Sequence, residues 1–137
     1  MTLILDTGPI VAALNGADPD HERCAALIAN TDDLLIPSPA LVEIDYWLTK
    51  LGGGQVWVDL VTDIVRGAYR LVHPGEAELA RAAELELAYL DLSLGFVDAS
   101  IVALCEQLGE TKLATLDRRH FSVVRPRHCS HLTLMPD

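Results

Sequence analysis

The sequence predicts an α/β fold in which helices cover both faces of a parallel sheet of four to five strands. Short, continuous apolar runs recur along the chain, which is typical of strands that are buried on both faces. Segments with apolar residues at helical spacing alternate with these runs, and this order favours a parallel sheet. Half of the 137 residues are hydrophobic and 5% are aromatic. We therefore expect a single domain over residues 1–137 with an aliphatic core.

The first strand is expected at residues 3–5, where three large aliphatic side chains precede Asp6. The run ends abruptly at that carboxylate and at Thr7-Gly8-Pro9. Asp6 would therefore stand at the carboxyl end of the strand, the edge at which open α/β sheets bind their ligands.

The rest of the chain alternates between helices and strands. The expected helices cover residues 10–14, 19–30, 40–51, 55–67, 76–89 and 93–109. The further strands are expected at residues 34–36, 69–72, 113–116 and 132–134, the last at the edge of the sheet.

Local signals set the expected helix boundaries. Asp18 is a good N-cap and Pro19 suits the first helical position. Ser38 and Ser93 are expected to begin the helices that follow them, and the glycines at 52–54 separate two helices. The expected apolar faces are Cys24, Leu27 and Ile28; Leu41, Ile44, Leu48 and Leu51; Val58, Val61, Ile64 and Val65; and Leu79, Ala83, Leu87 and Leu90.

Four acidic residues are expected at one edge of this sheet. Asp6 follows the first strand, Glu43 lies early in the helix after the second strand, and Asp117 follows the fourth strand. Because the carboxyl ends of parallel strands meet at one edge, these side chains should lie close together.

Asp98, the fourth acid, lies on the expected buried face of its helix. A carboxylate in such a position is costly unless it is paired or bound to a metal, and no lysine or arginine lies within a helical turn of it. The apolar residues that share this face are Leu94, Ile101, Val102 and Cys105.

Each acid alone also has an ordinary structural interpretation. Asp6 and Asp98 could cap helices, Glu43 could be solvated, and Asp117 could belong to a turn. Together, however, clustered carboxylates repel one another unless a cation neutralises them, and hard oxygen ligands suit Mg²⁺ or Mn²⁺. Such a site can polarise a phosphoryl oxygen and activate water.

Two threonines flank Asp6 and Asp117. The hydroxyls of Thr7 and Thr115 could hold those carboxylates in position. Helix capping for Thr7 and strand propensity for Thr115 are the alternatives.

Four sequence blocks resemble the PIN domain, and more narrowly the VapC-type toxins of bacterial toxin–antitoxin pairs. They are Leu-Asp-Thr-Gly-Pro at 5–9, Pro-x-Leu-Val-Glu at 39–43, Phe-Val-Asp-Ala-Ser at 96–100 and Thr-Leu-Asp-Arg-Arg-His-Phe at 115–121. No single block is specific, but all four occur in order and the resemblance covers essentially the whole chain.

The resemblance implies a three-layer α/β/α sandwich and an endoribonuclease that depends on Mg²⁺ or Mn²⁺. It also implies a homodimer that is inhibited by a small cognate antitoxin, whose tail enters the acidic cleft. The implied catalytic and metal-binding residues are Asp6, Glu43, Asp98 and Asp117, with Thr7 and Thr115 in supporting roles.

The charge distribution bears on an RNA substrate. The net charge of −10 argues against a nucleic-acid partner, but residues 111–137 hold five of the ten Lys and Arg residues and only two acids. This segment is therefore +3 and the remainder −13. The candidate contacts to RNA phosphates are Arg118, Arg119, His120, Arg125 and Arg127, with a solvated surface as the alternative for each.

Cysteine usage and hydropathy predict a cytoplasmic protein without membrane association. Cys24, Cys105 and Cys129 are an odd number without framework spacing, so we expect reduced thiols. No apolar run is long enough to cross a bilayer, and no secretory signal is expected. Trp47 and Trp57 are expected in the core or in a dimer interface rather than as platforms for base stacking.

Two other function classes stay open at this stage. The first is a non-catalytic binding module with the same fold, which the complete set of four acids argues against. The second is an aspartate-based phosphatase. That chemistry usually needs a second Asp two residues after the first, where this chain has Gly8.

Overall fold

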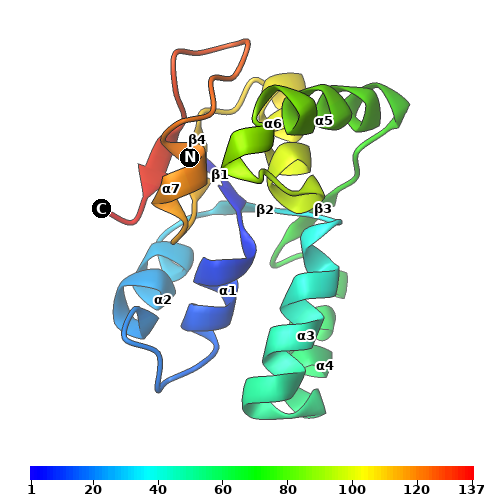
Figure 1. Cartoon of the computed structure of the whole chain (residues 1–137). Coiled ribbons are helices and arrows are strands. Elements are labelled where there is room, and N and C mark those ends of the chain that lie inside the picture. Colours follow the sequence, from blue (N-terminus) through cyan, green and yellow to red (C-terminus); the bar gives the residue numbers. More distant parts are fainter.

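The computed structural model describes all residues, 1–137, as a five-stranded sheet between two layers of helices (Figure 1). The sheet has the order β3-β2-β1-β4-β5, and every neighbouring pair is parallel. The predicted three-layer parallel α/β/α fold is thus confirmed. The strands are β1 (Thr2–Leu5), β2 (Asp33–Pro37), β3 (Arg70–Val72), β4 (Lys112–Ala114) and β5 (Thr133–Met135).

Alternate side chains of β1 enter different cores, because successive residues of a strand point to opposite faces. Ile4 packs in the core that α5 and α6 cover, whereas Leu3 and Leu5 pack in the core under α1, α3 and α4. All three side chains are fully buried.

None of the helices is long and apolar enough to span a membrane. The helices are α1 (Thr7–Ala13), α2 (His21–Ala29), α3 (Ala40–Gly52), α4 (Gly54–Val65), α5 (Glu76–Ala88), the 3₁₀ turn η1 (Leu90–Leu92), α6 (Phe96–Leu108) and α7 (Arg118–Phe121).

Helices α3 and α4 form a hairpin that extends from the sheet (Figure 1). They are joined at Gly53, whose φ of 80° is a conformation that residues with a side chain rarely adopt. The predicted break in the glycine run is therefore confirmed as a tight turn.

Two predicted helix starts and one predicted cap are wrong, whereas α3 begins at Ala40 as expected. α2 begins at His21, because Asp18 instead accepts a hydrogen bond from the backbone N of Asp20 in a preceding turn. Ser38 makes no side-chain cap on α3, and its backbone N donates to Val72 O. Ser93 lies in the left-handed region at the end of η1, and Gly95 is the N-cap of α6.

The predicted core face of α5 is also wrong. Leu79 and Leu87 are 53% and 75% exposed, whereas Ala82 and Leu85 are buried. Ala82, Leu85 and Tyr89 form an alternative stripe at helical spacing, and this stripe packs against the core beside α6.

Parts of two other predicted faces stay open to solvent. Ile44 and Leu48 of α3 are buried as expected, but Leu51 is exposed. On α4, Val58 and Val65 are exposed as well. All three residues belong to the hairpin of α3 and α4 that extends from the sheet (Figure 1).

Candidate metal centre and active site

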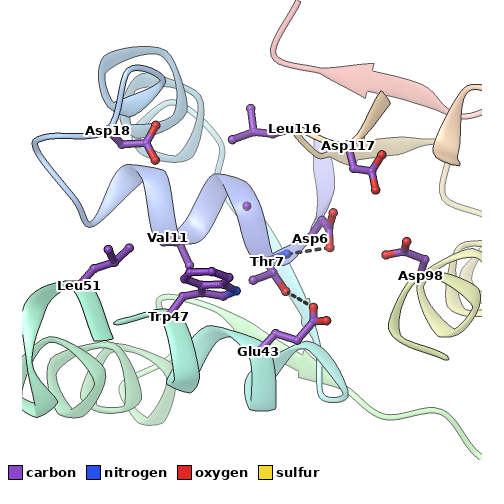
Figure 2. A pocket seen from close by; sticks show the side chains of 11 residues that line it. Asp6, Thr7, Val11, Asp18, Glu43, Trp47, Leu51, Asp98, Leu116 and Asp117 are labelled. Atoms are coloured by element: carbon purple, nitrogen blue, oxygen red, sulfur yellow. Dashed lines mark hydrogen bonds between the residues drawn. The ribbon is translucent and has the colours of Figure 1, made fainter. Parts of the chain in front are cut away.

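The four expected acids line one cleft of about 710 Å³ at the carboxyl ends of β1 and β4 (Figure 2). Asp6 ends β1, Glu43 lies in the first turn of α3, Asp98 lies in the first turn of α6, and Asp117 precedes α7. The parallel pairing of β1 with β4 places two of these positions side by side. Thr7, Gly8, Val11, Asp18, Trp47, Leu51 and Leu116 also line the cleft.

Asp6 is fixed by a hydrogen bond to each carboxylate oxygen. The backbone N of Thr7 donates to Oδ1 over 2.8 Å, and the Thr115 hydroxyl donates to Oδ2 over 2.8 Å. Asp6 is therefore the N-cap of α1 and at the same time one wall of the cleft. Only 7% of the residue is exposed.

Burial and like charge oppose ionisation of Asp6. The pKa of Asp6 is raised from 3.8 to about 6, chiefly by burial and then by the negative charge of Asp98. The hydrogen bonds from Thr115 and Thr7 act in the opposite direction, whereas Glu43 raises the pKa further. The pKa of Asp98 is also raised, again mainly by burial. A bound cation would favour the ionised form of both carboxylates and so offset the cost of burying these like charges.

Glu43 is held by the helix on the other side of the cleft. The Thr7 hydroxyl donates to Glu43 Oε1 over 2.9 Å, so the first turn of α1 is tied to the first turn of α3 (Figure 2). Thr7 therefore contacts two acids, Asp6 through its backbone and Glu43 through its side chain.

His120 joins the other two acids. Its Nδ1 lies 2.8 Å from Asp98 Oδ2 and 3.0 Å from Asp117 Oδ2. An ionised carboxylate only accepts hydrogen bonds, so Nδ1 would donate to these two acids in their ionised form. One ligand atom from each of the three residues lies within 4.8 Å of the others, a spacing at which one metal ion could be shared.

Sequence reasoning grouped His120 with the basic tail and did not expect this contact. The available signal was its position three residues after Asp117. Asp117 accepts a hydrogen bond from His120 N as the N-cap of α7, and this turn brings the imidazole back to the carboxylates.

Asp18 and Trp47 were also missed as cleft residues. Asp18 was expected only as a helix cap, but it lies at the far end of the cleft (Figure 2). Trp47 was expected in the core or in a dimer interface, yet its exposed indole lines the cleft. Its signal is its position one helical turn beyond Glu43.

The expected RNA-contacting arginines lie on the surface near α7. The Arg118 guanidinium donates to Pro136 O over 2.6 Å, and that of Arg125 donates to Ser122 O. Arg119 is exposed, and one of its guanidinium nitrogens lies 3.3 Å from His120 Nε2. Their role towards RNA stays a prediction.

The donor atoms of the cleft fit a hard divalent cation. No lysine or arginine forms an ion pair with any of the four acids. Asp6, Glu43, Asp98 and Asp117 supply carboxylate oxygens, which Mg²⁺ and Mn²⁺ prefer. The residues present therefore fit the cation that the sequence predicts.

The chain is similar to known proteins over nearly its whole length. The PIN domain family model matches residues 3–125. "Ribonuclease VapC26" of Mycobacterium tuberculosis is 33% identical over 135 residues, which are 98% of this chain and 100% of that protein.

Solved structures support the fold. The M. tuberculosis toxin VapC20, described as cleaving the sarcin-ricin loop, matches 82% of this chain and 87% of its own, with a TM-score of 0.76 and 20% identity. A toxin–antitoxin complex from Klebsiella pneumoniae matches 90% of this chain and 92% of its own, with a TM-score of 0.65 and 18% identity.

Proposed function

This chain belongs to the PIN domain family, and from that membership we propose that it is a metal-dependent endoribonuclease that acts as the toxin of a toxin–antitoxin pair. The observation that carries the proposal is the cleft lined by five carboxylates, the four expected acids and Asp18, none of them paired with a lysine or arginine. Similarity to a ribonuclease along the whole chain supports the same activity.

Asp6, Glu43, Asp98 and Asp117 are the proposed ligands of Mg²⁺ or Mn²⁺. When bound, the ion would polarise a phosphoryl oxygen and activate the water that attacks the phosphodiester. Hydrogen bonds of 2.8 to 2.9 Å from Thr7 and Thr115 hold Asp6 and Glu43 in place at this edge of the sheet, where their oxygens could also accept a hydrogen bond from that water.

Three further side chains orient these ligands. The Thr115 hydroxyl holds Asp6, the Thr7 hydroxyl holds Glu43, and the His120 imidazole holds Asp98 and Asp117. Fixing the carboxylates in advance lowers the cost of bringing like charges together when the ion and the RNA bind. Arg118, Arg119 and Arg125 are proposed to contact RNA phosphates beside the cleft.

A small antitoxin is the proposed protein partner. The Klebsiella structure with the same fold is a toxin–antitoxin complex. The acidic cleft favours a basic tail of such a partner, because opposite charges steer association. We also propose that the chain forms a homodimer, because the exposed leucines of α5 offer an apolar surface for a second copy. The proposed site of action is the cytoplasm.

Cleavage of total RNA by the purified protein tests the proposal. We expect cutting with Mg²⁺ or Mn²⁺, no cutting with a chelator, and loss of both cutting and growth arrest in Asp98→Asn. Asp59→Asn is the matched control, because Asp59 is an exposed residue of α4 outside the cleft and accepts a hydrogen bond from Gln55. If Asp98→Asn cuts RNA as fast as the parent, the assignment is wrong.

A further inference from the structure

One wall of the catalytic cleft is aromatic. Trp47 lies one helical turn after Glu43 on α3, which is about 6 Å along the helix axis. Its indole is 42% exposed and lines the cleft. Figure 2 places it beside Val11 and Leu51, on the side of Glu43 that faces away from Asp98. The aromatic surface therefore begins where the cluster of acids ends.

Tyr46 and Lys50 extend this wall out of the cleft. The Tyr46 ring meets the Trp47 ring edge to face, with centroids 5.2 Å apart and an interplanar angle of 86°. Lys50 Nζ lies 5.6 Å from the Tyr46 centroid and 5.3 Å from the Trp47 centroid. We call these three residues the aromatic ledge. Tyr46 and Lys50 also line a second hollow of about 320 Å³ on the same helix.

The ammonium group of Lys50 is free for a ligand. Lys50 takes part in none of the ion pairs of the protein. By contrast, the arginines at 23, 70, 81 and 127 are each paired with a carboxylate. The positive charge of Lys50 therefore lies next to two exposed rings, in the second hollow, which Asp45 also lines.

We propose that the aromatic ledge binds an unpaired nucleotide of the RNA next to the cleaved phosphodiester. The base would stack on the Trp47 indole, and a backbone phosphate would contact Lys50. This inference rests on the proposed ribonuclease function and specifies its substrate class. A nucleotide combines a flat π face with an anion, and this combination matches the ring and the ammonium group.

The geometry selects single-stranded RNA or the loop of a hairpin. Paired bases are stacked on their neighbours and do not offer a free face, whereas unpaired bases can turn out and stack on aromatic side chains. The edge-to-face contact with Tyr46 limits rotation of the indole, so little conformational freedom is lost on stacking. A basic peptide would be attracted by the acids but repelled by Lys50. The charge of Lys50 therefore favours RNA over a basic protein segment at the ledge.

In a Trp57→Phe variant the tryptophan emission reports on the ledge alone, because Trp47 is then the only tryptophan. Asp98→Asn in the same chain keeps the RNA intact. We expect a single-stranded oligoribonucleotide to quench the Trp47 emission saturably, and a duplex of the same length to do so much more weakly.

Affinity and kinetics test each member of the ledge. In the chain with Asp98→Asn, Trp47→Ala should weaken single-strand binding by about 5- to 100-fold, and Trp47→Phe should retain most of it. Lys50→Gln should reduce the slope of log affinity against log salt by about 0.7. Arg66→Gln removes the same charge from a residue that lines neither hollow and should leave single-strand binding unchanged. In the active chain, Trp47→Ala should raise KM more than it lowers kcat.

Two results would overturn the inference while the proposed function stands. The first is that Trp47→Ala cleaves single-stranded RNA with an unchanged KM. The second is that Trp47→Ala binds RNA as the parent does but no longer binds the antitoxin, which would make the ledge a protein-docking surface. A parent protein that cleaves no RNA would instead remove the proposed function and the inference with it. Trp47→Phe and the thermal melting of each variant separate these results from a folding defect.

Discussion

At Asp6, burial and neighbouring negative charge favour the protonated carboxyl, whereas metal binding requires the ionised form. The pKa lies near 3.8 in an unfolded chain and at about 6 in the folded protein. The folded state therefore holds more protons between these values, and the free energy of unfolding falls as the pH rises through that window. Above pH 6 the penalty is fully present, at about 3 kcal/mol.

Asp6→Asn should consequently stabilise the metal-free protein at pH 7.5 while abolishing metal binding and RNA cleavage. We expect a gain in the free energy of unfolding of about 2 kcal/mol. Urea denaturation with a chelator measures it, and the difference from the parent should shrink at pH 4, where the parent carboxyl is mostly neutral as well. A variant that is less stable than the parent at pH 7.5 would show that the buried charge is already compensated.

Thr115 is expected to act through Asp6. Thr115→Val keeps the shape of the side chain but removes the hydroxyl that donates to Asp6 Oδ2. We expect Mn²⁺ affinity to fall by about 10-fold or more, because groups that orient metal ligands contribute on this scale. Calorimetry measures the affinity, and Thr133→Val on the exposed edge strand β5 is the matched control. Equal affinities in the two variants would contradict the role of Thr115.

Among the elements, α5 and α6 are joined by a bidentate ion pair. Arg81 Nε and a terminal guanidinium nitrogen donate to the two carboxylate oxygens of Glu106, over 2.9 and 3.0 Å. The two side chains are 18% and 10% exposed. α6 carries Asp98 at its first turn, so this pair helps to fix the helix that presents one of the acids.

Arg81→Met should destabilise the protein by about 2 kcal/mol, since it leaves the Glu106 carboxylate largely buried without its guanidinium partner. Arg23→Met breaks the more exposed pair with Asp20, and there we expect less than about 1 kcal/mol. Chemical denaturation of both variants gives the comparison. Similar losses in the two would mean that the α5–α6 pair contributes no more than a surface pair.

The positions of the strands could be predicted from the sequence, whereas the inward faces of some helices could not. Strands such as β1 were predictable because a buried parallel strand leaves a continuous aliphatic run. The inward face of α5 was not, because leucines and alanines lie on both of its sides and packing against α6 decides between them. α6 is buried on nearly all sides, so its periodicity could not distinguish the side that faces the cleft.

The same distinction holds within the site. Asp6 and Asp117 could be placed at one edge because each directly follows a strand of a parallel sheet. The contact of His120 with Asp98 depends on a four-residue helix, and its side-chain direction leaves little trace in the sequence. Trp47 was expected in the core or in a dimer interface because an aromatic residue at helical spacing usually packs against another apolar surface.

For the whole molecule, the net charge of −10 and the acidic cleft predict stabilisation by divalent cations. Binding to the folded state alone raises the free energy of unfolding by about 2.7 kcal/mol at a hundred times Kd. Because Asp6 must ionise, the rise in Tm with Mg²⁺ or Mn²⁺ should be larger at pH 7.5 than at pH 5. Thermal melting at both pH values measures it, and an equal rise at both would point to non-specific charge screening.

The central claim is that four carboxylates from separate segments meet in an arrangement that a divalent cation neutralises. Calorimetric titration of the metal-free protein with Mn²⁺ at pH 7.5 tests it most directly. We predict saturable binding by the parent and by Asp59→Asn, and loss of that binding in Asp98→Asn. Binding of Mn²⁺ by Asp98→Asn with the affinity of the parent, or no saturable binding by the parent, would contradict the account.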